Sequence, residues 1–133
     1  MKQSSIIFSI LIIVFLVISS CNKPGTDGKA TLKVLGQHHG RTIPNITGHL
    51  DTVYVKFNAV DLPSDPTHNY DVFFVGVAGQ EYTLCPNLHV GDYFLYVAGW
   101  DTAINQRTTG GMAVKIKFSD RKKEIETIVA ITE

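Results

Sequence analysis

The chain has 133 residues, of which 44% are hydrophobic, and its 12 Lys and Arg residues balance its 12 Asp and Glu residues. This length is enough for one domain with a core of modest size. A chain without net charge gives no electrostatic case for a nucleic-acid partner, because phosphate binding needs a basic patch.

The N-terminal residues follow the order of a secretory signal. Lys2 precedes an apolar run from Ile6 to Ile18, which only Ser9 interrupts. A membrane-spanning helix needs about 20 apolar residues, so the run is short for one. The pattern predicts a signal peptide over residues 1–20. The alternatives are an uncleaved anchor helix and ordinary signal cleavage near an incidental cysteine.

Cys21 ends the pattern Ile18-Ser19-Ser20-Cys21. This pattern resembles a bacterial lipobox, whose cysteine is lipidated and becomes the mature N-terminus. The resemblance implies lipidation of Cys21 and a place in the cell envelope, on the outer membrane in preference to the inner one, with the leaflet open. If Cys21 carries lipid, Cys85 has no partner, and we expect no disulfide.

The segment after the signal is polar and rich in glycine and proline. We expect a flexible tether over residues 21–29 and one folded domain over residues 30–133. The first strand of the domain is predicted over residues 30–35, where apolar and polar side chains alternate.

Weaker strand signals separate the first strand from the second. Residues 37–41 are predicted to form a turn, and residues 42–46, which include a proline, an extended edge segment. Alternation resumes over residues 52–58, which predicts the next strand.

The middle of the chain predicts a hairpin. Residues 61–69 contain two prolines and are predicted to form a loop. Residues 70–77 are apolar on both faces, so we expect a strand that is covered on both sides for part of its length. A turn over residues 78–80 then leads to residues 81–84, which we expect to run back beside it.

The aromatic and aliphatic run over residues 88–100 predicts the central strand of the fold, in which Tyr93, Leu95 and Val97 share one face. A loop is predicted over residues 101–111 because this segment is polar and ends in glycine.

Two further strands are predicted over residues 112–118 and 124–131. The first is expected to point Met112, Val114, Ile116 and Phe118 inward. Seven strands separated by turns, with no amphipathic helix of useful length, predict an all-β fold, an antiparallel β-sandwich.

Several short motifs are spread over the chain: His38-His39-Gly40-Arg41, Ile43-Pro44-Asn45, Val53-Tyr54-Val55-Lys56-Phe57, Tyr70-Asp71, Ala78-Gly79, Leu88, Gly91-Asp92-Tyr93-Phe94-Leu95-Tyr96, Gly99-Trp100-Asp101 and Gly110-Gly111-Met112-Ala113-Val114. Together they resemble the small lipoproteins of Bacteroidota that carry a transthyretin-like (prealbumin-like) domain, related to carboxypeptidase regulatory-like domains. The resemblance implies a seven-stranded Greek-key sandwich tethered to an envelope membrane, and it implies no known reaction.

Histidines are the candidates for metal ligands. A metal site needs three or four ligands that converge in space. His38 and His39 would point to opposite sides of an extended backbone, whereas a turn would let them converge with His49 or His68. We predict no metal site and no other cofactor, and His38 and His39 are the nearest candidates for one.

Signals for catalysis are sparse. Cys85 is predicted to be a small buried residue, the alternative being a reactive thiol with His89 as its base. We therefore expect a protein that is not an enzyme. The alternative is a small envelope hydrolase that uses histidine and aspartate residues in the loops over residues 37–41 and 63–71.

Two threonines are candidates for modification. Asp51-Thr52-Val53 and Asp101-Thr102-Ala103 resemble the acceptor pattern of O-glycosylation in Bacteroidota envelope proteins. The resemblance implies Thr52 and Thr102 as acceptors. We favour Thr102, because a loop position should be exposed.

The central strand also predicts a partner surface. If Tyr93 faces the core, then Phe94 and Tyr96 face away from it and form an outer apolar patch with Tyr54. The alternative is cross-strand packing within the sheet. We expect a membrane-tethered module that binds an envelope protein or a glycan through loops or one sheet face, or that stabilises a larger assembly.

Overall fold

The computed structural model describes residues 23–133, so the predicted signal peptide over residues 1–20 and the predicted lipid site Cys21 lie outside the described residues. Strands dominate this part of the chain, and no helix within it has the length and apolar character to cross a membrane. The elements are β1 (Ala30–His38), β2 (Arg41–Thr42), β3 (Thr52–Phe57), β4 (Val72–Val75), β5 (Thr83–Leu88), β6 (Gly91–Asp101), β7 (Gln106–Ile116), the 3-10 helix η1 (Phe118–Asp120) and β8 (Glu124–Ala130).

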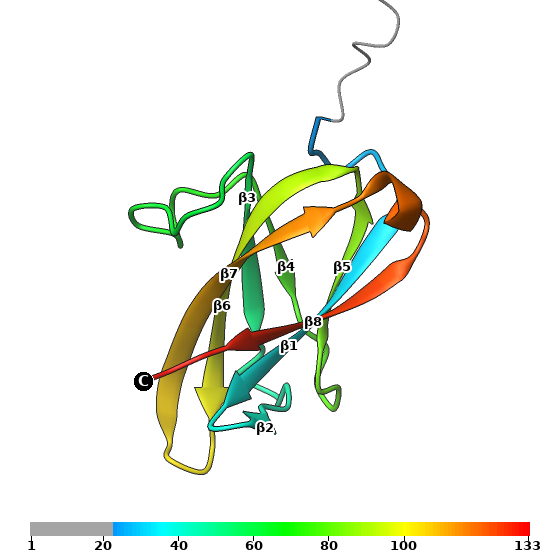
Figure 1. Ribbon diagram of the computed structural model, residues 1–133. Coiled ribbons are helices and arrows are strands. Elements are labelled where there is room, and N and C mark those ends of the chain that lie inside the picture. Colours follow the sequence, from blue (N-terminus) through cyan, green and yellow to red (C-terminus); the bar gives the residue numbers. More distant parts are fainter. Residues whose placement is uncertain (1–22) are drawn as a thin grey trace, which may run out of the picture.

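The strands form two four-stranded sheets (Figure 1). In the first, β1 pairs antiparallel with β2 and β5 and parallel with β8. The second has the order β4-β3-β6-β7 and is antiparallel throughout. The all-β prediction is confirmed, but the prediction of wholly antiparallel pairing is wrong. A parallel pair needs a long connection, and most of the chain lies between β1 and β8.

The core lies between the two sheets and follows the period of two along the strands. Leu32 on β1, Val53 and Val55 on β3, and Tyr93 and Leu95 on β6 are all fully buried. Each such side chain contributes about 1.5–3 kcal/mol to the free energy of unfolding. The face of the central strand that carries Tyr93, Leu95 and Val97 is thus the inward one, and β6 lies between β3 and β7 in its sheet.

The predicted hairpin over residues 70–84 is wrong. β4 pairs with β3, whereas β5 pairs with β1 in the other sheet, so the turn over residues 78–80 carries the chain between sheets. The buried side chain of Asn45 holds this crossing, because its amide donates to the carbonyls of Gln80 at 3.1 Å and Tyr82 at 3.2 Å. Turn residues mark a change of direction, and long-range contacts decide which sheet receives the next strand.

β4 is an edge strand with one open face. Phe73 and Val75 are 49% and 47% exposed, so the prediction that this strand is covered on both sides is wrong. Its inward residues Val72 and Phe74 pack against the core. The apolar side chains on one face of β4 therefore pack on the core, whereas those on the other face are partly exposed to solvent.

β7 begins earlier than predicted. It pairs with β6 from Asp101↔Gln106 to Gly91↔Ile116, so only residues 102–105 remain as the turn. Pairing with a long neighbour outweighs the low strand propensity of glycine and polar residues. Ile116 is buried as predicted, but Met112 is 37% exposed and Phe118, which lies in η1, is 63% exposed, so their predicted inward direction is wrong.

The predicted tether is docked from Pro24 onward. Pro24 is buried beside Gly91, the amide of Gly25 donates to the hydroxyl of Tyr93 at 3.1 Å, and the amide of Gly28 donates to Asn87 at 2.9 Å. Residues 24–29 therefore belong to the domain and not to a free tether. Pro24 thus lies at the Gly91 end of β6, whereas His38 contacts Asp101 at the other end of that strand.

Candidate functional site

Aromatic side chains gather on the outward face of the second sheet. Tyr54 on β3 is directly opposite Phe73 on β4 and Tyr96 on β6. The ring of Tyr54 lies 6.4 Å from that of Tyr96 and 5.1 Å from that of Tyr70, and the rings of Tyr70 and Phe73 lie 5.7 Å apart. These centroid distances are typical of interacting aromatic pairs. We call Tyr54, Tyr70, Phe73, Tyr96 and Trp100 the aromatic face.

The sequence predicts that Phe94 belongs to this outer patch, but in the structure it does not contribute to the aromatic face. It is only 6% exposed, because its ring covers Gly111 on β7. A Cβ atom at Gly111 would lie 2.6 Å from a ring carbon of Phe94. The structure thus gives Phe94 the cross-strand packing role and places Tyr70 and Phe73 beside Tyr54 instead.

A hollow of about 230 Å³ lies on the same side of this sheet. It combines the rings of Tyr54 and Trp100 with the polar side chains of His49, Thr52 and Arg107. The imidazole of His49 stacks on the indole of Trp100, with ring centroids 4.5 Å apart and ring planes 21° apart. Stacked and tilted rings beside hydrogen-bonding groups form a surface that can hold an amphipathic ligand.

Three residues of the hollow were missed from the sequence. Trp100 follows Tyr96 at an even spacing along β6, so the period of two places it on the outer face. His49 and Arg107 come from the loop before β3 and from β7, and no local pattern links them to Trp100.

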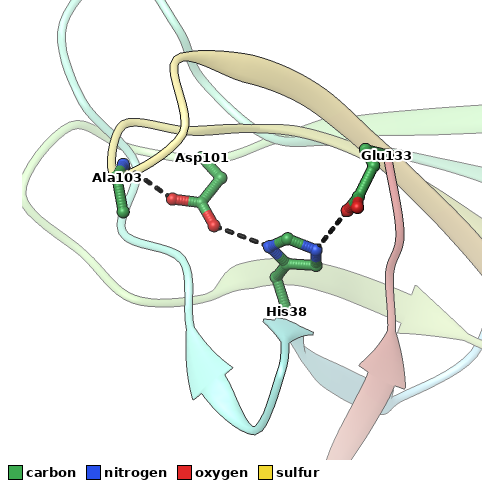
Figure 2. A network of polar contacts seen from close by, with 4 residues as sticks. All are labelled: His38, Asp101, Ala103 and Glu133. Atoms are coloured by element: carbon green, nitrogen blue, oxygen red, sulfur yellow. Dashed lines mark hydrogen bonds and ion pairs between the residues drawn. The ribbon is translucent and has the colours of Figure 1, made fainter.

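The second candidate site surrounds His38 (Figure 2). His38 is the last residue of β1, not part of a turn as predicted, and it is only 3% exposed. Its Nδ1 lies 2.7 Å from Oδ2 of Asp101, and its Nε2 lies 2.6 Å from Oε2 of Glu133. The other oxygen of Asp101, Oδ1, accepts a hydrogen bond from the amide of Ala103 at 2.8 Å.

The two carboxylates favour the charged imidazole. The hydrogen bond to Asp101 raises the pKa of His38, and Glu133 adds to this effect, whereas burial opposes it. The hydrogen bond from His38 in turn lowers the pKa of Asp101. The charged imidazole of His38 therefore links the end of β1 to Asp101 at the end of β6 and to Glu133.

The exposed side chain of His39 lies beside this network. His39 has a left-handed backbone, with φ of 48°, which turns its ring toward His38 at a centroid distance of 4.2 Å. The expected partners are elsewhere: His49 stacks on Trp100, and His68 contacts Asp65 at 2.9 Å. Glu133 is the third potential metal ligand within reach of both His38 and His39.

The two loops of the alternative hydrolase are not brought together. Residues 37–41 lie near the Asp101 end of β6, whereas the loop over residues 63–71 follows Asn58, whose amide donates to Asp92 at the other end of that strand. About 30 Å of extended strand separates these ends. The structure therefore does not bring the two loops together into one site.

The remaining candidate residues are separate from one another. Cys85 is fully buried, and burial raises the pKa of its thiol to about 12, so it is protonated at neutral pH and is not a nucleophile. Thr102 is exposed in the turn between β6 and β7, and Thr52 is half-buried on β3. Thr102 thus has the accessibility that modification requires, and its glycosylation stays a prediction.

Comparisons with known proteins give no assignment: no family model matches the chain, and neither the curated proteins nor the solved structures contain a match.

Proposed function

We propose that this protein is a lipid-anchored module of the cell envelope that binds a glycan through the aromatic face and the adjoining hollow. The observation that carries this proposal is the hollow in which Tyr54 and Trp100 lie beside His49, Thr52 and Arg107. Sugar rings present C–H groups on their faces and hydroxyl groups on their edges. Aromatic rings and polar side chains match these two kinds of surface.

The shape of the site favours a glycan over a protein partner. At about 230 Å³ the hollow is smaller than the about 300–1,000 Å³ of sites that enclose drug-sized ligands. It suits one sugar ring, while further rings extend over Tyr54 and Tyr96. Arg107 and His49 supply hydrogen-bond donors to hydroxyl groups.

The anchor is part of the same proposal. With lipid on Cys21, docking of residues 24–29 would set the Gly91 end of β6 toward the membrane. Trp100 lies near the opposite end of β6, so the proposed site would face away from the membrane. Kinship with Bacteroidota lipoproteins that carry transthyretin-like, Greek-key domains is also part of the proposal, and the two four-stranded sheets are compatible with it.

Affinity electrophoresis in gels that contain envelope polysaccharides or peptidoglycan fragments tests the glycan proposal. We expect at least one glycan to retard the wild-type protein, and Trp100→Ala and Tyr54→Ala to weaken retardation about tenfold or more. Phe118→Ala is the matched control, because Phe118 is an exposed aromatic residue in η1, away from the aromatic face. Retardation by no glycan, or retardation that Trp100→Ala leaves unchanged, contradicts the proposal.

Metabolic labelling with radioactive palmitate tests the anchor. Wild-type protein should take up the label, and Cys21→Ala should abolish it. Cys85→Ala is the control, since this buried thiol lies inside the domain and should not affect labelling. Equal labelling of wild-type and Cys21→Ala protein rules out lipidation at Cys21.

A further inference from the structure

The geometry points to a second site that is independent of the aromatic face: we propose that His38, His39 and Glu133 bind a divalent transition-metal ion of the zinc type. Two imidazoles and one carboxylate are a ligand set that Zn²⁺ takes up in proteins, with a fourth position left open. Imidazole nitrogen also suits Cu²⁺ and Ni²⁺. The three side chains come from the end of β1, the turn after it and residue 133.

The distances suit one shared ion. One donor atom from each of His38, His39 and Glu133 lies within 4.8 Å of the others. Bond lengths of about 2.0–2.2 Å place the donors of a tetrahedral Zn²⁺ site roughly 3.3 Å apart. His39 and Glu133 are exposed, so rotation of their side chains can close the remaining distance while the buried His38 stays in place.

Asp101 prepares His38 for this role. The carboxylate of Asp101 accepts a hydrogen bond from Nδ1–H of His38 at 2.7 Å and also accepts one from the amide of Ala103 at 2.8 Å, which holds it in place. This contact orients the ring so that Nε2 points at Glu133 (Figure 2). A buried carboxylate behind a histidine ligand is the usual arrangement that fixes the tautomer and raises ligand basicity.

The ion would replace a proton. In the structure Nε2 of His38 contacts Oε2 of Glu133 at 2.6 Å, and binding requires Nε2 to give up its proton to solvent and donate its lone pair to the metal. The net charge of the cluster rises by one, because a divalent cation replaces a single proton between the two carboxylates.

The site has room for a further ligand. A hollow of about 350 Å³ borders His38 and His39, and Ile128, Ala130 and Ile131 also line it. A water molecule or a small ligand in this hollow can complete the coordination shell. The open position distinguishes this arrangement from a closed structural site.

Isothermal titration calorimetry tests the proposal. The full chain is first dialysed against a chelator and is then titrated with Zn²⁺ alone. We expect one ion per chain and at least a tenfold loss of affinity in His39→Ala and Glu133→Gln. The matched control is His68→Ala, which removes an exposed histidine beside Asp65 at the other end of the domain and should not change affinity. His39→Ala leaves the contact between His38 and Asp101 intact, so its effect does not depend on loss of the fold.

Electron paramagnetic resonance of the Cu²⁺-loaded chain supplies a second readout. Nitrogen hyperfine structure from two imidazoles is expected in the wild type and from one imidazole in His39→Ala. The absence of stoichiometric Zn²⁺ binding, or affinity that His39→Ala and Glu133→Gln leave unchanged, overturns the proposal and leaves the network a structural clamp only. Neither result depends on whether the aromatic face binds a glycan.

Discussion

Asp51 and Asp101 begin the same two-residue pattern, Asp-Thr, and they are 2% and 6% exposed, yet their electrostatic environments are opposite. Asp101 accepts hydrogen bonds from His38 and from the amide of Ala103, and its pKa is lowered. Oδ1 of Asp51 has no hydrogen-bond partner among the described residues, and burial raises the pKa of Asp51 to about 6.

The comparison shows that burial alone does not decide whether a carboxyl group is charged. Burial favours the neutral form, and a nearby cation or donor reverses that preference. Asp51 lies against Gly99 on β6, where a Cβ atom would be 2.5 Å from Oδ1, so this close approach leaves no space there for a partner. Asp101 lies at the end of its strand, where the ends of other segments can meet it.

The largest expected effect comes from removing the partner of Asp101. His38→Ala leaves the buried Asp101 without its cation, as Asp51 is now, and we expect Tm to fall by about 15 °C at pH 7. Scanning calorimetry measures this change. His39→Ala is the matched control and should shift Tm by no more than about 2 °C, because His39 is exposed. Equal Tm values for His38→Ala and His39→Ala would show that the network does not stabilise the fold.

Removing the buried charge of Asp51 should, in contrast, stabilise the protein. Asp51→Asn keeps the shape and removes the buried charge, and we expect the free energy of unfolding at pH 7 to rise by about 2 kcal/mol. The full effect of a pKa raised to about 6 is reduced because the new amide also lacks partners. Urea denaturation measures the change, and a lower unfolding free energy for Asp51→Asn would contradict this account.

The pH dependence of stability should separate the two aspartates. Because the folded state holds the proton of Asp51 up to about pH 6, its contribution to stability falls as pH rises from about 4 to 6 and is constant above that. The lowered pKa values of Asp101 and Glu133 give stability that is lost as pH falls below about 4. The raised pKa of His38 adds stability that is lost as pH rises above 6.5.

Urea midpoints measured between pH 3 and pH 8 check this profile. Asp51→Asn should remove the fall in stability between pH 4 and 6, and Asp101→Asn should weaken the loss below pH 4. A profile for Asp51→Asn that is parallel to that of the wild type over pH 4–6 would exclude a protonated Asp51 in the fold.

The smallest effect on stability is expected at the threonines that follow the two aspartates. Thr102 is exposed, so Thr102→Ala should change Tm by less than about 2 °C while removing any attached glycan in a Bacteroidota host. Mass spectrometry of the purified protein measures the glycan. Thr52→Ala is the matched comparison, and a glycan that persists in Thr102→Ala but is absent from Thr52→Ala would reverse the assignment.

Local patterns predicted much of the fold. The period of two along β6 correctly directs Tyr93, Leu95 and Val97 into the core, because alternate side chains of a strand face opposite sides. The same period indicates that Tyr96 and Trp100 lie on the outer face. Alternation likewise predicted β1 and β3, although it ended β1 before His38.

The sequence by itself determined that this chain forms strands and which side chains of the inner strands are buried, because these properties depend on neighbours along the chain. Only the tertiary structure decided that β5 leaves the sheet of β4, that β8 runs parallel to β1 and that Phe94 covers Gly111. His38 and Glu133 are 95 positions apart, and Asp51 differs from Asp101 only through what surrounds it. Contacts between distant segments set these outcomes, and no local spacing encodes them.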